Sequence, residues 1–464
     1  MAGTMFLEKV KSPGLAHLSY IVGHGGQAAV IDPRRDCAVY VAIAHENGAR
    51  ITHIFETHRN EDYVIGSRDL ARRTGAEIHH GKNLDFAYGR PVSEGDTFEL
   101  GDIRLKILET PGHTFESISI ALFDTGFGDQ PIGVFTGDCL FIGAVGRTDF
   151  FPDRAREVAG LQYDSIFKKL LPLGDQVLLY PAHGAGSVCG SGMADREFST
   201  LGYERMFNPD LQAERREAFI EKKVSGHEYQ PPYFRKMEEY NQKGSAPVMD
   251  RLPEPPPMSP QEFEQAMQRK ALAVDLRSPE AFAGAFVPGS LALPLEMVPA
   301  FAGYFIPYDQ DLILIGKNQS EIDTAVRYFI RMGYDRLSGF LSPGLHGWET
   351  SGRAYGRIPA VHVNELVRRI EAKERFTLLD VREISELEET GKLPGAVHIF
   401  LGELPGRLEK IPRDRPVTTF CGSGQRAIIA ASILKQNGFQ EVEDSLGSMA
   451  ACEAAGCPID MQKV

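Results

Sequence analysis

The sequence predicts an α/β protein of several domains, and three observations support this. Segments typical of strands and of helices alternate along the first part of the chain, as in layered α/β folds. A stretch from Pro247 to Pro260 holds six prolines in fourteen residues, which is typical of a stiff, extended spacer. An internal repeat, offset by 105 residues, follows that spacer. A chain of 464 residues is also too long for one core.

Composition and charge narrow the functional classes. With 42% hydrophobic and 24% charged residues, the chain has the composition of a soluble globular protein. Its formal net charge of -13 gives no electrostatic reason to expect nucleic acid or an acidic membrane as partner. No segment approaches the roughly 18 apolar residues of a membrane span, and Met1 to Pro13 is charged where a signal peptide would be apolar. We therefore expect a cytoplasmic protein.

The cysteines favour a reducing compartment. Six of them are spread over the whole chain, which does not suggest a disulfide framework. Cys452 and Cys457 are close enough to suggest a redox pair, but their spacing is not Cys-x-x-Cys. We expect two packed thiols there.

Polar residues follow several of the expected strands in the first part of the chain. The pattern is a strand, a glycine-rich turn and a strand over residues 18 to 33, then a helix over 37 to 47 and a strand over 51 to 55. Strands and helices are expected to alternate from there to about residue 185. Function in α/β layers tends to lie in the loops after strand ends. Four such loops carry His58, His113, Asp138 and His183, and together these favour a metal site.

The residues around these positions resemble a known superfamily. The motifs are Thr110-Pro-Gly-His113, Gly137-Asp138 and Gly146-Arg147-Thr148-Asp149-Phe150. They resemble the metallo-β-lactamase superfamily over roughly residues 5 to 240, and within it the persulfide dioxygenase branch, with glyoxalase II thioesterases as close relatives. The resemblance implies an αββα sandwich.

One motif departs from the superfamily pattern. Where His-x-His-x-Asp-His is usual, this chain reads His58-Arg-Asn60-Glu-Asp62-Tyr63. In two-zinc hydrolases the positions matching Asp62, Tyr63 and His183 hold the second metal. A tyrosine is a poor ligand for Zn²⁺, so a two-metal hydrolytic site is disfavoured.

The remaining ligands are His58, His113 and Asp138. Two histidines and one carboxylate leave open positions on a metal, as in non-haem Fe(II) oxygenases. The resemblance implies one Fe(II) per chain, a low-molecular-weight persulfide and O₂ as substrates, and sulfite as product. Zn²⁺ accepts the same ligands and stays the alternative. Asp62 and His183 would then orient ligands and water.

Two further residues lie near these motifs. Arg147 could pair with a substrate carboxylate or stabilise its own loop through Asp149. Cys189, on the glycine-rich loop from Gly184 to Gly192, could approach a ligand closely. We favour a small buried residue for Cys189.

A six-residue loop near the C-terminus predicts a reactive thiol. Cys421 to Arg426 lies between a strand, 417 to 420, and a helix, 427 to 437. Inward-facing N–H groups and the helix start would stabilise a thiolate at Cys421. Asp380, Arg382 and Leu393-Pro-Gly complete a resemblance to rhodanese domains, which implies a persulfide on the cysteine. The loop is Cys421, Gly422, Ser423, Gly424, Gln425 and Arg426. We expect Asp380 and Arg382 to form a structural ion pair.

The repeat makes the preceding segment rhodanese-like as well. Ala273-Val-Asp275-Leu-Arg277 matches Leu378-Leu-Asp380-Val-Arg382. The same offset puts Gly316 opposite Cys421 and Glu321 opposite Arg426. With neither nucleophile nor cation, this copy should be catalytically silent.

These observations predict four segments. They are a dioxygenase-like domain (1–246), a proline-rich linker (247–258), a silent rhodanese-like domain (259–355) and an active rhodanese domain (359–464). The order resembles persulfide dioxygenase and rhodanese fusion proteins.

The fusion would oxidise a thiol persulfide to sulfite and transfer sulfur between persulfide, sulfite and thiosulfate. The sequence does not distinguish glutathione, coenzyme A and bacillithiol as the carrier thiol. It also leaves a homo-oligomer as an alternative to a monomer. Two rival readings are a zinc thioesterase with an accessory sulfurtransferase and a sulfide-responsive scaffold.

Overall fold

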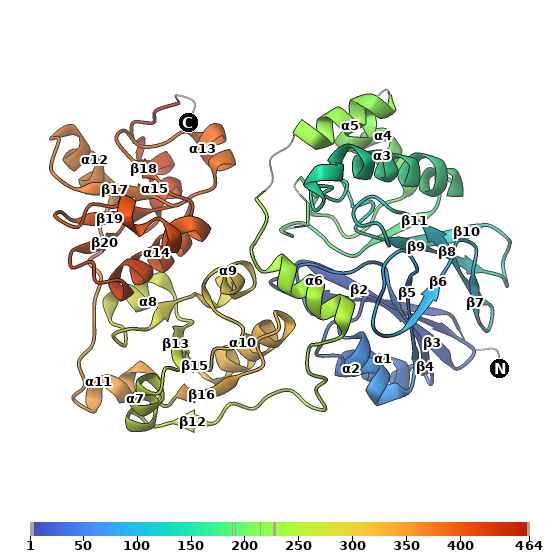
Figure 1. Cartoon of the computed structure of the whole chain (residues 1–464), viewed down its shortest axis with the longest axis horizontal. Coiled ribbons are helices and arrows are strands. Elements are labelled where there is room, and N and C mark those ends of the chain that lie inside the picture. Colours follow the sequence, from blue (N-terminus) through green and yellow to red (C-terminus); the bar gives the residue numbers. More distant parts are fainter. Residues whose placement is uncertain (1–3, 188, 191, 214, 226–228, 462–464) are drawn as a thin grey trace. The chain divides into compact units, whose positions relative to one another are not determined.

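The chain divides into two compact units in the computed structural model (Figure 1), which describes residues 4–187, 189–190, 192–213, 215–225 and 229–461. The first unit comprises Met1–Leu252 with Ile330–Gly333, and the second comprises Pro253–Phe329 with Tyr334–Val464. Met1 to Gly3, Val188 and Ser191 belong to segments discussed above and lie outside the described residues. Among the described helices, none has both the length and the apolar character that a membrane crossing requires.

The first unit contains two facing sheets (Figure 1). The first has the order β1-β2-β3-β4-β5-β6 and the second the order β11-β10-β9-β8-β7. The strands of the first are β1 Phe6–Ser12, β2 His17–His24, β3 Gln27–Ile31, β4 Arg50–Glu56, β5 Glu77–Gly81 and β6 Arg90–Val92. Those of the second are β7 Thr97–Leu100, β8 Ile103–Glu109, β9 Ile118–Asp124, β10 Pro131–Gly137 and β11 Leu178–Pro181.

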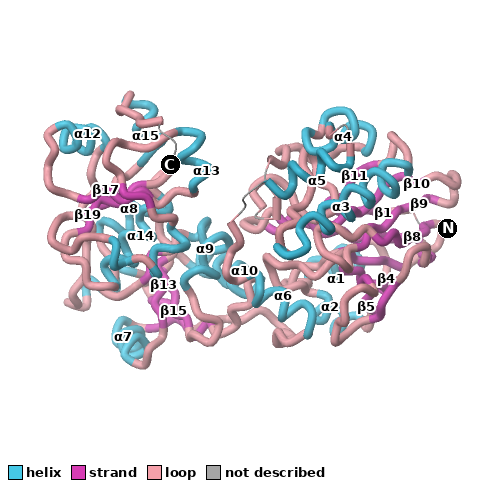
Figure 2. Tube along the Cα trace, turned by 45° about the horizontal axis from the view of Figure 1, so that its top comes forward, coloured by secondary structure: helices cyan, strands magenta, loops and turns pink. Residues whose placement is uncertain are grey.

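Helices cover the outer faces of both sheets, which gives the αββα sandwich predicted from the sequence (Figures 1 and 2). Side chains alternate along each strand, so one face of β3 packs between the sheets through Ala29 and Ile31. The other face, with Ala28 and Val30, packs near Tyr40 of α1. The helices are α1 Ala38–Glu46, α2 Ser67–Thr74, α3 Ala155–Ser165, α4 Leu201–Phe207, α5 Arg216–Ser225 and α6 Phe234–Lys243.

The expected alternation of strands and helices up to about residue 185 is wrong in its middle part. From β5 to β10 the described chain runs through consecutive strands with no helix between them. Strands β7 to β10 pair antiparallel through short turns, and antiparallel neighbours need no helical crossover.

The second unit contains two sheets whose described strands all pair in parallel, with helices around them (Figure 2). The orders are β12-β16-β15-β13-β14 and β18-β17-β19-β20. The strands are β12 Pro257–Met258, β13 Leu272–Asp275, β14 Leu291–Ala292, β15 Leu312–Ile315, β16 Leu337–Leu341, β17 Thr377–Asp380, β18 Val397–His398, β19 Val417–Phe420 and β20 Val442–Asp444. The helices are α7 Pro260–Gln268, α8 Pro279–Gly284, α9 Val298–Phe305, α10 Gln319–Arg331, α11 Leu345–Thr350, α12 Val363–Glu371, α13 Ile384–Thr390, α14 Gln425–Gln436 and α15 Ser448–Ala455.

The repeat predicted from the sequence is confirmed by these elements. Strand β13 matches β17 and strand β15 matches β19 at the 105-residue offset, and each of β15 and β19 leads into a long helix, α10 or α14. Parallel strands buried on both faces explain the continuous apolar run of β15, all four residues of which are buried.

The proline-rich segment 247–258 is not a free spacer. At its start, the Met249 N–H donates to Asp69 Oδ1 at 2.6 Å, in the first unit. At its end, Pro257 and Met258 form β12, which pairs with β16 in the second unit. Prolines are tolerated at such a sheet edge because no ladder donor is needed there.

The expectation of two packed thiols at Cys452 and Cys457 is wrong, because the structure joins them in a disulfide. Gly456 follows the last residue of helix α15 and has the left-handed conformation, with φ at 69°. This turn brings the Cys457 N–H to the Cys452 carbonyl at 3.0 Å and leaves the two Cα atoms 5.0 Å apart. The described free cysteines are Cys37, Cys139, Cys189 and Cys421, all buried.

Asp380 and Arg382 form a buried ion pair at the end of β17, as the sequence analysis expected. Arg382 Nη2 lies 2.7 Å from Asp380 Oδ2, and both side chains are almost fully buried. The guanidinium also donates to Thr390 Oγ1 and to the Gly391 carbonyl, both at 2.8 Å. The pair therefore fixes the start of the loop that follows α13.

Replacing Arg382 by methionine should destabilise the last domain strongly. The change leaves the Asp380 charge buried without its partner, which costs roughly 3–5 kcal/mol. Urea unfolding of the full chain, followed by circular dichroism, should show an earlier transition. Arg375→Met is the control, because Arg375 is exposed and its pair with Asp414 should contribute little. Equal unfolding midpoints for the two variants would contradict the stabilising role of the buried pair between Asp380 and Arg382.

Candidate functional site

The four predicted strand-end residues all follow strands of the first unit. His58 comes two residues after β4, His113 lies in the loop between β8 and β9, Asp138 directly follows β10, and His183 comes after β11. All four side chains are buried. The loops of two sheets thus bring polar groups from distant parts of the chain to one edge of the sandwich.

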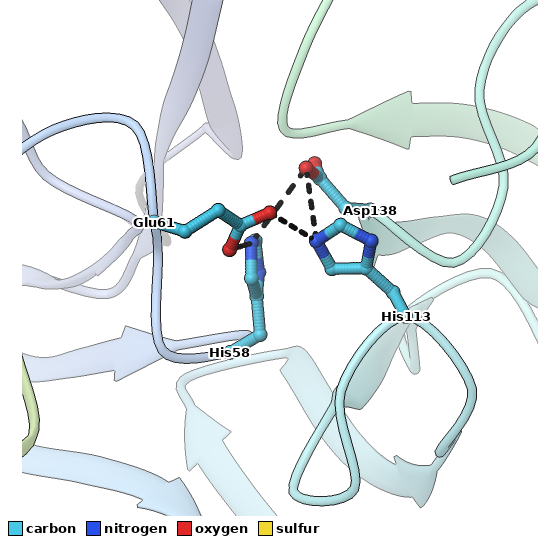
Figure 3. A group of neighbouring side chains, drawn as sticks. All are labelled: His58, Glu61, His113 and Asp138. Atoms are coloured by element: carbon cyan, nitrogen blue, oxygen red, sulfur yellow. Dashed lines mark ion pairs between the residues drawn. The ribbon is translucent and has the colours of Figure 1, made fainter. Parts of the chain in front are cut away.

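Three of these residues face one another, together with Glu61 (Figure 3). His113 Nε2 lies 2.7 Å from Glu61 Oε1 and 3.5 Å from Asp138 Oδ2. His58 Nε2 lies 3.7 Å from the same Asp138 oxygen and 3.9 Å from Glu61 Oε2. We call His58, Glu61, His113 and Asp138 the first cluster.

Hydrogen bonds from the outer ring nitrogens orient the two histidines of the first cluster. His58 Nδ1 lies 2.9 Å from Thr57 Oγ1, whose hydroxyl donates to Asp32 at 2.7 Å. His113 Nδ1 lies 2.9 Å from the Arg147 carbonyl, so that nitrogen must carry a proton. Both rings therefore present Nε2 to the cluster, the arrangement in which protein histidines bind metals.

Burial and neighbouring charges perturb these groups. Burial lowers the pKa of His58 to about 3. Burial also lowers the pKa of His113, but the Glu61 carboxylate outweighs it and raises that pKa to about 9. Burial raises the pKa of Asp138, but His183 and His58 outweigh it and hold this pKa below its ordinary value. Opposite charges are thus packed closely in a buried site.

The first cluster fits a divalent metal ion. The Nε2 atoms of His58 and His113 and both oxygens of Glu61 are buried and form no hydrogen bond of acceptable geometry. Native proteins rarely leave several such atoms unsatisfied in one place. Imidazole nitrogens with carboxylate oxygens suit Fe(II) and Zn²⁺ alike.

Glu61 is the member of this cluster that the sequence analysis missed. It lies three residues after His58, inside the motif that departs from the superfamily pattern. A carboxylate so close to a candidate ligand was a usable signal, but its direction depends on how the loop turns. The structure turns Glu61 toward the histidines and turns other residues of the motif away.

Asn60 and Tyr63 lie outside the first cluster. Asn60 Nδ2 points back to the His58 carbonyl at 3.3 Å. The Tyr63 hydroxyl lies 2.8 Å from His17 Nε2, and burial raises the pKa of Tyr63 well above its ordinary value. The phenol is therefore neutral and hydrogen-bonded to a histidine. Asp62, His183 and Cys189 form a separate buried group beside the first cluster.

Arg147 forms a two-point ion pair with Asp149 in its own loop. Its Nε and Nη2 atoms lie 2.7 and 2.6 Å from the two Asp149 oxygens. The guanidinium also lies over the rings of Phe150 and Phe234, at 5.4 and 5.5 Å. Of the two roles considered for Arg147, these contacts support the stabilisation of its loop.

The Cys421 loop has the geometry expected of a thiolate cradle. The Gly424 N–H donates to Cys421 Sγ at 3.1 Å, and the Cys421 N–H donates to Ser448 Oγ at 3.1 Å. Gly424 has φ of 99°, a conformation that glycine adopts without strain, and α14 begins directly after it. Arg426 pairs with Glu386 through two contacts of 2.5 and 2.6 Å. The sequence analysis missed Glu386.

The corresponding loop of the preceding domain is occupied by its own carboxylate. Glu321 Oε2 accepts a hydrogen bond from the Lys317 N–H at 2.6 Å. A carboxylate that binds loop N–H groups takes the place of an incoming anion. The geometry at Gly316 and Glu321 therefore supports a silent loop.

Family models match both parts of the chain. The model described as the metallo-beta-lactamase superfamily matches residues 12–183, and the rhodanese-like domain model matches residues 259–351 and 362–455. The first cluster and the Cys421 loop lie within these ranges.

The curated sequence relatives match only part of this chain. A persulfide dioxygenase of Bos taurus, ETHE1, is 28% identical over 45% of this chain and 76% of its own length. A hydroxyacylglutathione hydrolase of Rhodospirillum rubrum is 33% identical over 34% of this chain and 57% of its own. Two uncharacterised proteins of Mycobacterium tuberculosis are 38% identical to this chain over 26% of its length. The match spans about half of the length of these relatives, 46%.

The chain is also similar to a solved structure that matches most of its length. The crystal structure of a metallo-beta-lactamase from Staphylococcus aureus subsp. aureus COL has a TM-score of 0.65 and is 32% identical. The match covers 74% of this chain and 99% of that chain. The chain therefore belongs to the metallo-beta-lactamase superfamily, and two rhodanese-like domains follow its metallo-beta-lactamase domain.

Proposed function

We propose that this protein oxidises a low-molecular-weight thiol persulfide with O₂ to sulfite and transfers sulfane sulfur through Cys421. The observation that carries the proposal is the first cluster, with its two oriented histidines and Asp138, on the same chain as an intact cysteine loop. The bovine relative supports the choice of substrate class, since it is called a persulfide dioxygenase. An identity of 28% to this relative does not establish which thiol carries the persulfide sulfur.

The metal in this proposal is one Fe(II), held by His58, His113 and Asp138. When bound, it supplies the redox chemistry by which O₂ oxidises the terminal sulfur of the persulfide. Glu61 adds a second carboxylate within 2.7 Å of His113 Nε2. Thr57 and the Arg147 carbonyl hold the two imidazoles in place, and the Arg147–Asp149 pair holds the loop that carries this carbonyl.

In the last domain, Cys421 carries the sulfur. The Gly424 N–H donates to Cys421 Sγ, and together with the start of α14 it stabilises negative charge on the thiolate that remains when the outer sulfur of a Cys421 persulfide leaves. That outer sulfur passes to sulfite, the sulfur–sulfur bond to Cys421 breaks, and the bond electrons remain on the Cys421 thiolate. The product is thiosulfate, and no external oxidant or reductant is needed.

His113→Ala should lose both metal and activity, because it removes one ligand of the first cluster. Protein purified without oxygen should contain about one iron per chain, as the two-histidine, one-carboxylate site requires. The variant should lose this iron together with persulfide-dependent O₂ uptake in an oxygen electrode. His45→Ala is the control, since His45 is exposed on α1. Thioester hydrolysis without O₂ uptake in the wild type would favour the rival thioesterase.

Gly316→Ser should leave O₂ uptake and sulfur transfer close to the wild type. The loop at Gly316 has neither a nucleophile nor a cation at the positions that match Cys421 and Arg426, and the nearest atom to an added Cβ is the flexible end of Ile322, at 2.9 Å. After incubation with ³⁵S-thiosulfate, peptide mapping should find label on the Cys421 peptide alone. Label on any peptide between residues 259 and 355 would show that this domain is not silent.

Cys421→Ser should change the product and not the rate of O₂ uptake. A hydroxyl cannot form a persulfide, while the first cluster is untouched. Ion chromatography should show sulfite in place of thiosulfate, and Cys37→Ser, which removes a buried thiol elsewhere, should behave as the wild type. Thiosulfate formed at the wild-type rate would exclude Cys421 as the carrier.

A further inference from the structure

The first unit includes a short segment from much later in the chain. Ile330–Gly333 belongs to this unit, although it lies within residues 259–351, which the rhodanese-like domain model matches. The segment contains the end of helix α10, and all four of its residues are buried. The silent rhodanese-like domain therefore contributes four residues to the compact unit that holds the first cluster. We call residues 330–333 the anchor segment.

A buried ion pair holds the anchor segment in the first unit. Arg331 Nε and Nη2 lie 2.8 and 2.7 Å from the two carboxylate oxygens of Asp36. Both side chains are almost fully buried. A two-point contact between a guanidinium and a carboxylate fixes the orientation of the arginine as well as its charge. Asp36 comes shortly after β3, so the anchor segment is tied to the strand region of the first domain.

The end of helix α10 uses its free carbonyls to bind the first domain. The last carbonyls of an α-helix have no partner within the helix and carry partial negative charge. The Ile330 carbonyl accepts a hydrogen bond from Arg35 Nη1 at 2.9 Å. The Arg331 carbonyl accepts one from the Val64 N–H at 2.7 Å. A guanidinium and a backbone N–H of the first domain thus satisfy this helix end.

Val64 belongs to the loop that carries two members of the first cluster. Residues 58–65, which we call the ligand loop, include both His58 and Glu61. Asn241 of α6 also binds this loop, because its amide donates to two loop carbonyls at 2.6 and 2.8 Å. The anchor segment and α6 therefore hold the ligand loop from two separate parts of the chain.

The rhodanese-like fold does not itself require an arginine at this position. At the 105-residue offset, Gln436 of the last domain matches Arg331. Gln436 is exposed and donates to the Gly289 carbonyl at 2.9 Å. Arg331, in contrast, is buried against Asp36. The arginine thus serves the first domain and not the fold of the domain that carries it.

We propose that Arg331 is a positioning residue for the metal site, supplied by the silent rhodanese-like domain. Its pair with Asp36 holds the anchor segment, and its carbonyl holds Val64 and with it the ligand loop that presents His58 and Glu61. This role goes beyond the proposed function, because it gives a domain without a reactive loop a part in the metal site. It rests on metal binding by the first cluster and not on the reaction that follows.

Metal affinity gives the first test. Metal-free full-length protein is titrated with Zn²⁺ against a chromophoric chelator. In Arg331→Met, the site that His113→Ala removes should bind Zn²⁺ roughly 10- to 100-fold more weakly, as when other residues that orient metal ligands are replaced. Arg331→Lys, which keeps the charge, should restore part of this affinity. Wild-type affinity in Arg331→Met would overturn the proposal.

Two controls separate this effect from a general loss of structure. Arg327→Met changes an exposed arginine one turn earlier on α10 and should bind Zn²⁺ as the wild type does. Sulfur transfer through Cys421 should stay near the wild-type rate in Arg331→Met, since the Cys421 loop belongs to the second unit.

Hydrogen exchange followed by mass spectrometry gives the second test, and it needs no metal. In Arg331→Met, peptides of the ligand loop should exchange about tenfold faster, because a local opening becomes easier. Peptides of β9, in the core between the sheets, should exchange as in the wild type. Unchanged exchange in the ligand loop, or faster exchange throughout the first domain, would overturn the proposal. A wild type that binds no metal would end the iron proposal, whereas the exchange result would still decide this one.

The variant Arg331→Met is expected to fold. Arg34 Nε lies 3.3 Å from Asp36 Oδ1, so the buried carboxylate keeps a cation beside it when Arg331 is replaced. If Arg331→Met is insoluble, Asp36→Asn removes the charge from the other side of the pair while keeping the shape of the side chain. The same loss of Zn²⁺ affinity and the same faster exchange of the ligand loop are then expected, and their absence would overturn the proposal.

Discussion

A single buried carboxylate, Asp138, holds together the polar groups of the first domain. Its oxygens lie 2.8 Å from His183 and 3.5 and 3.7 Å from His113 and His58, and all four side chains are buried. Charges in such an interior interact strongly, and a charge left alone there is costly. The three imidazoles can therefore share one small volume only because this carboxylate faces all of them.

The arrangement of strands explains why the groups meet at Asp138. Strands β4 and β10 run in different sheets, and each ends at the same edge of the sandwich as β11. Residues directly after strand ends have backbones fixed by the sheet, whereas their side chains remain free to face the edge. Close packing between the sheets, with Phe55 and Phe135 fully buried, keeps this edge rigid.

The two rhodanese-like domains differ in the group that accepts a backbone N–H in the loop after the matching strand, β15 or β19. In the last domain a thiol accepts the N–H of Gly424, and in the preceding one the Glu321 carboxylate accepts the N–H of Lys317. Both solutions satisfy the inward-facing N–H groups after a parallel strand. Satisfying these groups stabilises the loop in either case. The domain can therefore keep its fold with or without a cysteine at this position.

The sequence alone predicted the domain order, the repeat and the residues of the reactive loop from Cys421 to Arg426. These features are local, because a strand, a turn and a helix start can be recognised from a short stretch. His58, His113 and Asp138 were named from their places after strand ends and from the resemblance.

The tertiary structure decided which other residues join them. Glu61, the His17 contact of Tyr63 and the Glu386 contact of Arg426 depend on how loops turn and which partners they meet. Tyr63 and His17 lie 46 residues apart and Arg426 and Glu386 lie 40 apart, so no local pattern joins them. The position of Cys189 beside Asp62 and His183 was not predictable for the same reason, because these residues come together only when two loops meet at one edge of the sandwich.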